Sequence, residues 1–189
     1  MIGSALPIEV QRQIREKLEH PFDLMMEAVA FRLGQLRQNE VRHYALVPKA
    51  EYWGIRIYAG DVAAIADFMA GRGPRLSYVS FVGIHRHGMD EAIEAIDRAL
   101  IGKSPAASPI LGYFSLQDPE LAWVNLVLFE DQETLLSWVD ATKHADDWAT
   151  AAALFSDIEK SVGTISCADG SVVLEPHRLV VRNYDATAV

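Results

Sequence analysis

The sequence predicts an α+β fold, and three observations support this prediction. Residues 41–69 align without a gap on residues 111–139, which begin 70 positions later, and the best-matched pairs are Leu46 with Leu116, Trp53 with Trp123, Asp61 with Asp131, and Phe68 with Trp138. The spacing of apolar residues also changes several times between the period of a helix and that of a strand. Finally, the segments of residues 75–184 follow the order β-α-β-β-α-β, in which two helices pack on one face of an antiparallel sheet.

Two helices are expected at the start of the chain. Apolar residues recur at helical spacing within residues 7–19, and His20-Pro21 interrupts this pattern because proline disfavours helical backbone in the residue before it. A second apolar stripe predicts a helix over residues 22–39 that packs against the core.

A hairpin and a short helix are expected next. Residues 41–58 have the alternation of two strands, with a turn at residues 48–50. Asp61 is the expected N-cap of a helix over residues 62–69, since an aspartate side chain accepts a hydrogen bond from a first-turn N–H. The run Gly71-Arg72-Gly73-Pro74 is interpreted as the turn that ends this helix.

The next segments are predicted to be a strand, a helix and another strand. Leu76–His85 has apolar residues on both faces, which is typical of a central strand. Helical spacing follows from Asp90 to Ile101, and after a loop of small residues Ile110–Leu116 returns to the strand pattern.

The rest of the chain is predicted to contain a strand over residues 121–129, a helix capped by Asp131 and a further helix over residues 145–162. The dipeptide Asp169-Gly170 indicates a tight turn, and a last β segment is expected over residues 172–184.

The predicted order of elements is that of a ferredoxin-like fold. We therefore divide the chain into an N-terminal helix (residues 1–21), a degenerate first α+β repeat (residues 22–74) and a second, ferredoxin-like repeat (residues 75–189), packed as one compact unit. The first repeat lacks its opening strand, so the strand at residues 76–85 is expected to close one unit and open the next.

Composition excludes several classes of partner. The chain has 26 acidic and 17 basic residues and a net charge of -9, whereas affinity for nucleic acid comes largely from clustered Lys and Arg. A single cysteine, Cys167, cannot form an intramolecular disulfide. No apolar run has the length of a membrane span or the pattern of a signal peptide. We expect a cytoplasmic protein that binds neither nucleic acid nor membrane.

One segment resembles a known superfamily. Residues 124–131, followed by Glu133, Leu135, Trp138 and finally His144, are similar to the dimeric α/β-barrel superfamily, in which a strand and an acidic residue precede a helix that leads to a histidine. The similarity covers residues 108–160 and is greatest to small monooxygenase-like members and their uncharacterised relatives.

This resemblance implies a barrel of two sheets, formed across a homodimer or within the chain as an intramolecular pseudo-dimer. It also implies a cleft for a small hydrophobic molecule or haem. Haem-degrading members use an Asn, a Trp and a His; Trp138 and His144 correspond to two of these, whereas Asn125 lies on a different strand from the family's Asn. Other members oxidise polycyclic phenols without a cofactor, and no cofactor is predicted here.

The tripeptide His85-Arg86-His87 is a candidate site at the end of a predicted strand. Two histidines at i and i+2 on a strand project to one face and bind a metal together if a third ligand, such as His144 or Asp90, lies nearby. The interpretation that we favour is a polar exit from the strand, and a further alternative is a substrate-facing general base at His85. No metal site is predicted.

Trp138 and His144 complete the candidate catalytic residues with His85. His144 follows a predicted helix, so it is interpreted either as a base at the mouth of a cleft or as a junction residue that binds a helix-end carbonyl. Trp138 either lines a pocket for a flat ligand or belongs to the core.

Two functions remain after the common motifs are searched. The chain has no phosphate-binding loop, dinucleotide fingerprint, zinc-protease motif or nucleophile elbow. The first hypothesis is a cofactor-independent, monooxygenase-like enzyme that acts on a small hydrophobic or aromatic molecule. The alternative is a non-catalytic small-ligand-binding or assembly domain. The enzyme requires polar groups that converge on one enclosed site, whereas the binding domain does not.

Overall fold

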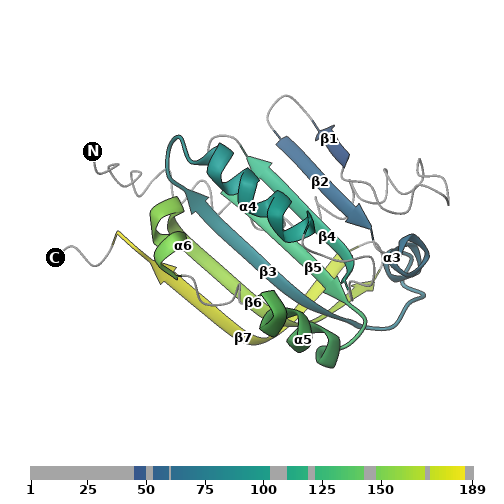
Figure 1. Ribbon diagram of the computed structural model, residues 1–189. Helices are drawn as coiled ribbons and strands as arrows, with labels where there is room; N and C mark the ends of the chain where they lie inside the picture. Colours follow the sequence, from purple (N-terminus) through teal and green to yellow (C-terminus); the bar gives the residue numbers. More distant parts are fainter. Residues whose placement is uncertain are drawn as a thin grey trace.

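The computed structural model describes residues 45–49, 53–59, 61–102, 110–118, 122–142, 148–168 and 171–185. Figure 1 shows one broad sheet with helices packed on it. The strands are β1 (Ala45–Lys49), β2 (Trp53–Ala59), β3 (Leu76–His85), β4 (Ile110–Asp118), β5 (Ala122–Phe129), β6 (Phe155–Ala168) and β7 (Ser171–Asn183). The helices are α3 (Val62–Met69), α4 (Asp90–Gly102), α5 (Gln132–Thr142) and α6 (Trp148–Leu154).

The strands form a single antiparallel sheet in the order β1-β2-β4-β5-β3-β6-β7 (Figure 1). The centre of the sheet is apolar because β3 and β5 are buried along almost their whole length. The prediction that Leu76–His85 is a central strand is therefore confirmed.

Helices cover both faces of this sheet. On one face, which we call the front face, Tyr113 and Val127 pack against α5, and Trp123 packs against α4 and α6. The back face carries the neighbouring residues, such as Phe114, which pack against Ile65 of α3. Successive residues of a strand point to opposite faces, so one continuous sheet supplies both cores.

The predicted ferredoxin-like dimeric α/β-barrel is wrong. The seven strands form one open, antiparallel sheet, and the hairpin β1-β2 pairs with β4 at the edge of that sheet. This hairpin does not start a second sheet that would pack against the first. The helices also lie on both faces, whereas the prediction placed two helices on one face.

The predicted helix over residues 145–162 is wrong from Phe155 onward. Helix α6 ends at Leu154, and β6 begins at Phe155 and pairs with β3. Phe155, Ile158 and Val162 are spaced as on a helix, which explains the error. From Ser161 to Ile165, however, every second residue is buried, as in a strand with one side on the core.

The two aligned segments of the sequence form the same local structure but not the same packing. Each is a hairpin followed by a helix, and Asp61 and Asp131 cap these helices by accepting hydrogen bonds from the backbone N–H groups of Ala64 (2.9 Å) and Thr134 (2.8 Å). Both predicted N-caps are thus confirmed. Helix α3 packs on the back face and α5 on the front face, so the correspondence does not extend to a repeated fold unit.

The C-terminal hairpin β6-β7 contains a bulge, because the pairing register shifts between Val162 and Gly163. Gly163 lies opposite Pro176, and a Cβ atom at Gly163 would collide with the backbone of Glu175 and Pro176. A glycine is required for this close approach. Proline is tolerated at Pro176 because β7 is an edge strand of the described sheet.

Candidate functional site

The imidazole of His85 lies at the end of β3, where the strand leads into α4. Its side chain is 4% exposed, and Nε2 is 3.7 Å from Oδ1 of Asp90. Nδ1 lies 3.4 Å from the carbonyl oxygen of Arg86, a contact in which the ring nitrogen donates. The same Asp90 oxygen accepts a hydrogen bond of 3.2 Å from Nε2 of Gln117. His85 is thus held in place, with little of its surface accessible to a substrate.

Trp138, the second candidate, lies on α5 and is part of the core. Its ring contacts that of Phe129 with a centroid distance of 5.4 Å, and 7% of the residue is exposed. Phe129 pairs with Ser77, and His85 lies eight residues beyond Ser77 on the same strand. Eight residues of strand correspond to about 26 Å. The structure therefore places His85 and Trp138 at opposite ends of the sheet, whereas His144 lies outside the described residues.

His85 and His87 do not project from one face of a single strand, which is the arrangement that a shared metal requires. Strand β3 ends at His85, and the chain then turns through Gly88, which has a φ of 77°. His85 is buried and His87 is exposed. Within the described parts of the chain, no group of three or more His, Cys, Asp or Glu residues is placed to hold a metal ion.

A hydrogen-bond network lies on the front face around Asn125, in the middle of β5. Oδ1 of Asn125 accepts hydrogen bonds from Ser115 Oγ (2.6 Å) and from the indole Nε1 of Trp123 (2.9 Å). Nδ2 donates to the hydroxyl oxygen of Tyr113 at 2.9 Å. An indole N–H can only donate, so this contact fixes which end of the amide is oxygen. The network holds the Asn125 side chain in one orientation.

Asn125 belongs to a line of side chains that crosses the sheet. Ser115 of β4, Asn125 of β5, Phe81 of β3 and Lys160 of β6 are successive cross-strand partners and share the front face. We call these four residues the central row. Ser115 is buried, but the other three are partly exposed.

The rows on either side of the central row are apolar and packed under helices. One consists of Trp123, Gly83 and Ile158 under α4 and α6, and the other of Val127, Val79 and Val162 beside α5. The central row is thus a partly exposed strip, polar at both ends and aromatic in the middle, between two apolar clusters.

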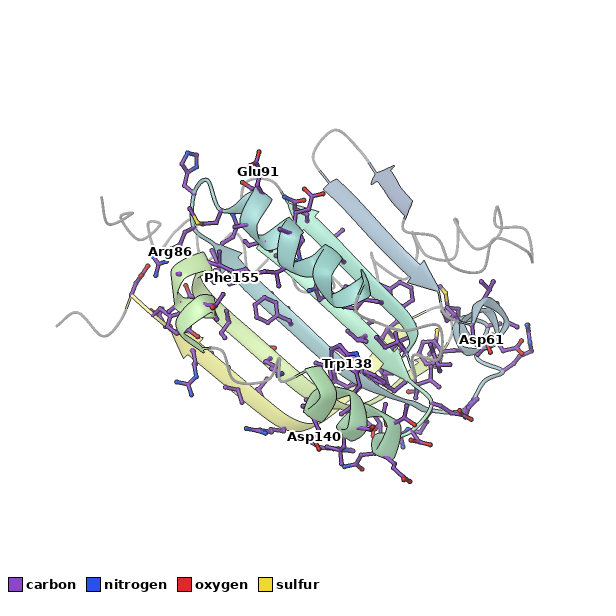
Figure 2. All side chains as sticks on the ribbon, in the orientation of Figure 1. Asp61, Arg86, Glu91, Trp138, Asp140 and Phe155 are labelled. Carbon is purple, nitrogen blue, oxygen red and sulfur yellow. The ribbon has the colours of Figure 1, made fainter. Side chains whose placement is uncertain are left out.

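Phe81 is held by a second aromatic ring. Its ring and that of Phe155 meet edge to face, with a centroid distance of 5.0 Å and an interplanar angle of 67°. Gly83 makes room for this pair, since a Cβ there would lie 2.5 Å from the Phe155 ring and 2.7 Å from the Phe81 ring. Figure 2 shows Phe155 near α6 and Trp138 at α5. These residues belong to the two apolar clusters on either side of the central row.

A buried hydroxyl on the back face is separate from this strip. The Tyr78 hydroxyl is hydrogen bonded to Ser161 Oγ at 2.7 Å. Burial raises the pKa of Tyr78 above its ordinary value of 10.0, and this outweighs the effect of the Ser161 hydrogen bond, which lowers that pKa. We assign this pair to the core.

The residues of the central row were not predicted to form a site. One signal was present, because Asn125 is a single polar residue in the apolar strand Ala122–Phe129, and a buried amide needs hydrogen-bond partners. Lys160 gave no signal, since its segment was predicted to be a helix.

No described helix has the length and apolar character needed to cross a membrane. Comparison of the chain with protein-family models, with curated proteins and with solved structures finds no match.

Proposed function

We propose that the protein binds a small, flat, hydrophobic or aromatic molecule over the central row. The observation that supports this proposal is the partly exposed Phe81, which lies between Asn125 and Lys160 in the strip that separates the two apolar clusters of the front face. A ring of this kind offers a stacking surface, and the fixed amide next to it offers directed hydrogen bonds.

Binding without catalysis is the function that the geometry supports best. A catalytic site needs an acid or base within reach of the bound molecule. His85 is 4% exposed and is separated from Trp138 by most of the length of β3. The monooxygenase-like enzyme, the homodimer and the cytoplasmic location stay predictions from the sequence.

Calorimetric titration of the full chain with 2-naphthol tests this proposal. We expect saturable binding at one site and a loss of affinity of about fivefold in Phe81→Leu, which keeps an apolar side chain but removes the ring. Phe68→Leu is the matched control, because Phe68 is a buried aromatic residue of the back-face cluster and should leave affinity unchanged.

Two results would contradict the proposal. One is the absence of saturable binding by the wild-type chain. The other is an equal loss of affinity in Phe81→Leu and Phe68→Leu, which would show that the ring acts only through general stability. Circular dichroism of each variant shows whether it is folded.

A further inference from the structure

Three cationic side chains gather at one end of the central row. Lys160 of β6 pairs with Val180 of β7, and the next front-face positions on β7 are Arg178 and Arg182. These arginines pair with Val162 and Ile158, which belong to the front-face clusters, so all three cations share that face. Diagonal neighbours on adjacent strands lie about 7 to 8 Å apart, which puts Lys160 between the two arginines.

This cluster stands out against the charge of the whole chain. The protein has a net charge of -9, yet the front-face positions at residues 158, 160 and 162 and at residues 178, 180 and 182 contain no acid. The nearest front-face acid along β7 is Glu175, which forms an ion pair with Arg75. Three side chains of the same charge at this end of the row favour an anionic group over a cationic one.

The row also has the dimensions of a particular kind of ligand. Asn125 and Lys160 are separated by the single strand β3, that is by two strand spacings, or about 10 Å. A bicyclic aromatic ring system spans this interval, with its flat face over Phe81. A hydroxyl or amide group at one end would then meet Asn125, and an acidic group at the other end would meet Lys160.

We infer that the ligand of the central row is an aromatic carboxylate, with its ring over Phe81 and its carboxylate beside Lys160, Arg178 and Arg182. This inference rests on the proposed function, because it names the class of molecule that the same site takes. It adds a charge requirement that the aromatic strip alone does not impose.

The experiment compares 2-naphthol with 6-hydroxy-2-naphthoate, which carries one additional carboxylate on the far ring. In calorimetric titrations of the full chain, we expect the carboxylate to bind at least tenfold more tightly. Lys160→Met should reduce this preference, measured as the ratio of the affinities for the carboxylate and for 2-naphthol, at least fivefold. Arg72→Met, which removes the same charge at an exposed residue paired with Asp67, should leave the preference intact. Added salt should also weaken the preference of the wild-type chain.

The outcomes separate this inference from the proposed function. If 2-naphthol binds but the carboxylate binds no more tightly, the anionic ligand class is refuted and the aromatic site stands. If Lys160→Met and Arg72→Met reduce the preference equally, the effect is one of net charge and the cluster is refuted. If neither probe binds the wild-type chain, both proposals fail. Should Lys160→Met not fold, Arg178→Met applies the same test from an exposed position.

Discussion

Replacing Asn125 by alanine removes the centre of the front-face network and is expected to destabilise the protein. Three side chains hydrogen bond to this amide, and all three are nearly inaccessible to water: Ser115 and Trp123 are 1% exposed and Tyr113 is 2% exposed. In the variant, each of them loses the partner that Asn125 provides.

The size of this loss of stability depends on which hydrogen bonds each group can still form without Asn125. The indole N–H of Trp123 can only donate, so the loss of its Asn125 acceptor costs roughly 1 to 3 kcal/mol. The Ser115 hydroxyl rotates more freely, so the loss of its hydrogen bond to Asn125 costs about 1 kcal/mol. The Tyr113 hydroxyl loses the donor that Asn125 provides but can still donate its own proton, so it adds nothing to the sum. The total is about 2 to 4 kcal/mol, or a melting temperature lower by roughly 6 to 12 °C at the middle of that range.

Urea denaturation followed by tryptophan fluorescence measures this loss, with far-ultraviolet circular dichroism as a second probe of the same transition. A double-mutant cycle with Trp123→Phe isolates the indole contact, and we expect a coupling energy of about 1 to 2 kcal/mol. Gln132→Ala, at an exposed residue of α5, is the control for a polar truncation that breaks no buried contact.

A loss of unfolding free energy in Asn125→Ala no larger than that in Gln132→Ala would refute this reasoning. Additive losses in the double-mutant cycle would also refute it, because Asn125 and Trp123 would then act independently. Either result would mean that water replaces the amide at little cost, and that Asn125 does not organise the network.

Three further predictions concern the framework around the site. Gly83→Ala should reduce the free energy of unfolding by about 1 to 2 kcal/mol, because the new Cβ would lie 2.5 Å from the ring of Phe155; unchanged stability in urea would show that the ring moves freely. The hydrogen bond that the Asp131 carboxylate accepts from the backbone N–H of Thr134 holds the pKa of this carboxyl below 3.8, so the folded state binds the proton less readily than the unfolded state. This carboxylate stabilises the fold fully above pH 3.8, and the stabilisation is lost as the pH falls through the lower, folded-state pKa. The variant Asp131→Asn keeps a capping side chain that does not titrate, so its stability should approach that of the wild type in acid. Urea midpoints of both proteins, measured from neutral pH to about pH 2, test this expectation. Arg86→Met should reduce the free energy of unfolding by about 2 kcal/mol, and Asp185→Asn should reduce it less. The ion pair joins two side chains that are each 24% exposed, and only Arg86 also donates a hydrogen bond, of 3.1 Å, to a backbone carbonyl of α6. Equal losses of stability in thermal unfolding would contradict this prediction.

The elements that the sequence predicted correctly are those whose signal is local. The strand at Leu76–His85 is apolar on both faces, and that pattern depends only on its own residues. The N-caps at Asp61 and Asp131 were also predictable, since a cap needs only a side chain and the first turn of its helix. The prediction failed at β6, where Phe155, Ile158 and Val162 fit both a helix and a strand, and only the pairing with β3 decides between them.

The candidate site was less predictable because its residues come from four strands. Asn125 and Lys160 are 35 positions apart in the sequence, and register alone brings them into one row. Conversely, His85 and Trp138 belong to segments that looked suitable for one cleft, yet the direction of β3 separates them.

The sequence by itself determined the local conformations of most described elements, the helix starts at the two capping aspartates and the apolar character of the central strands. These properties depend on neighbours within a few positions of the chain. The tertiary structure alone decided that the hairpin β1-β2 joins the same sheet, that α3 and α5 pack on opposite faces, and that Ser115, Asn125, Phe81 and Lys160 share one row. The reason is that strand pairing is a contact between distant segments, and the same strand pattern is compatible with several partners until their registers and faces are chosen together.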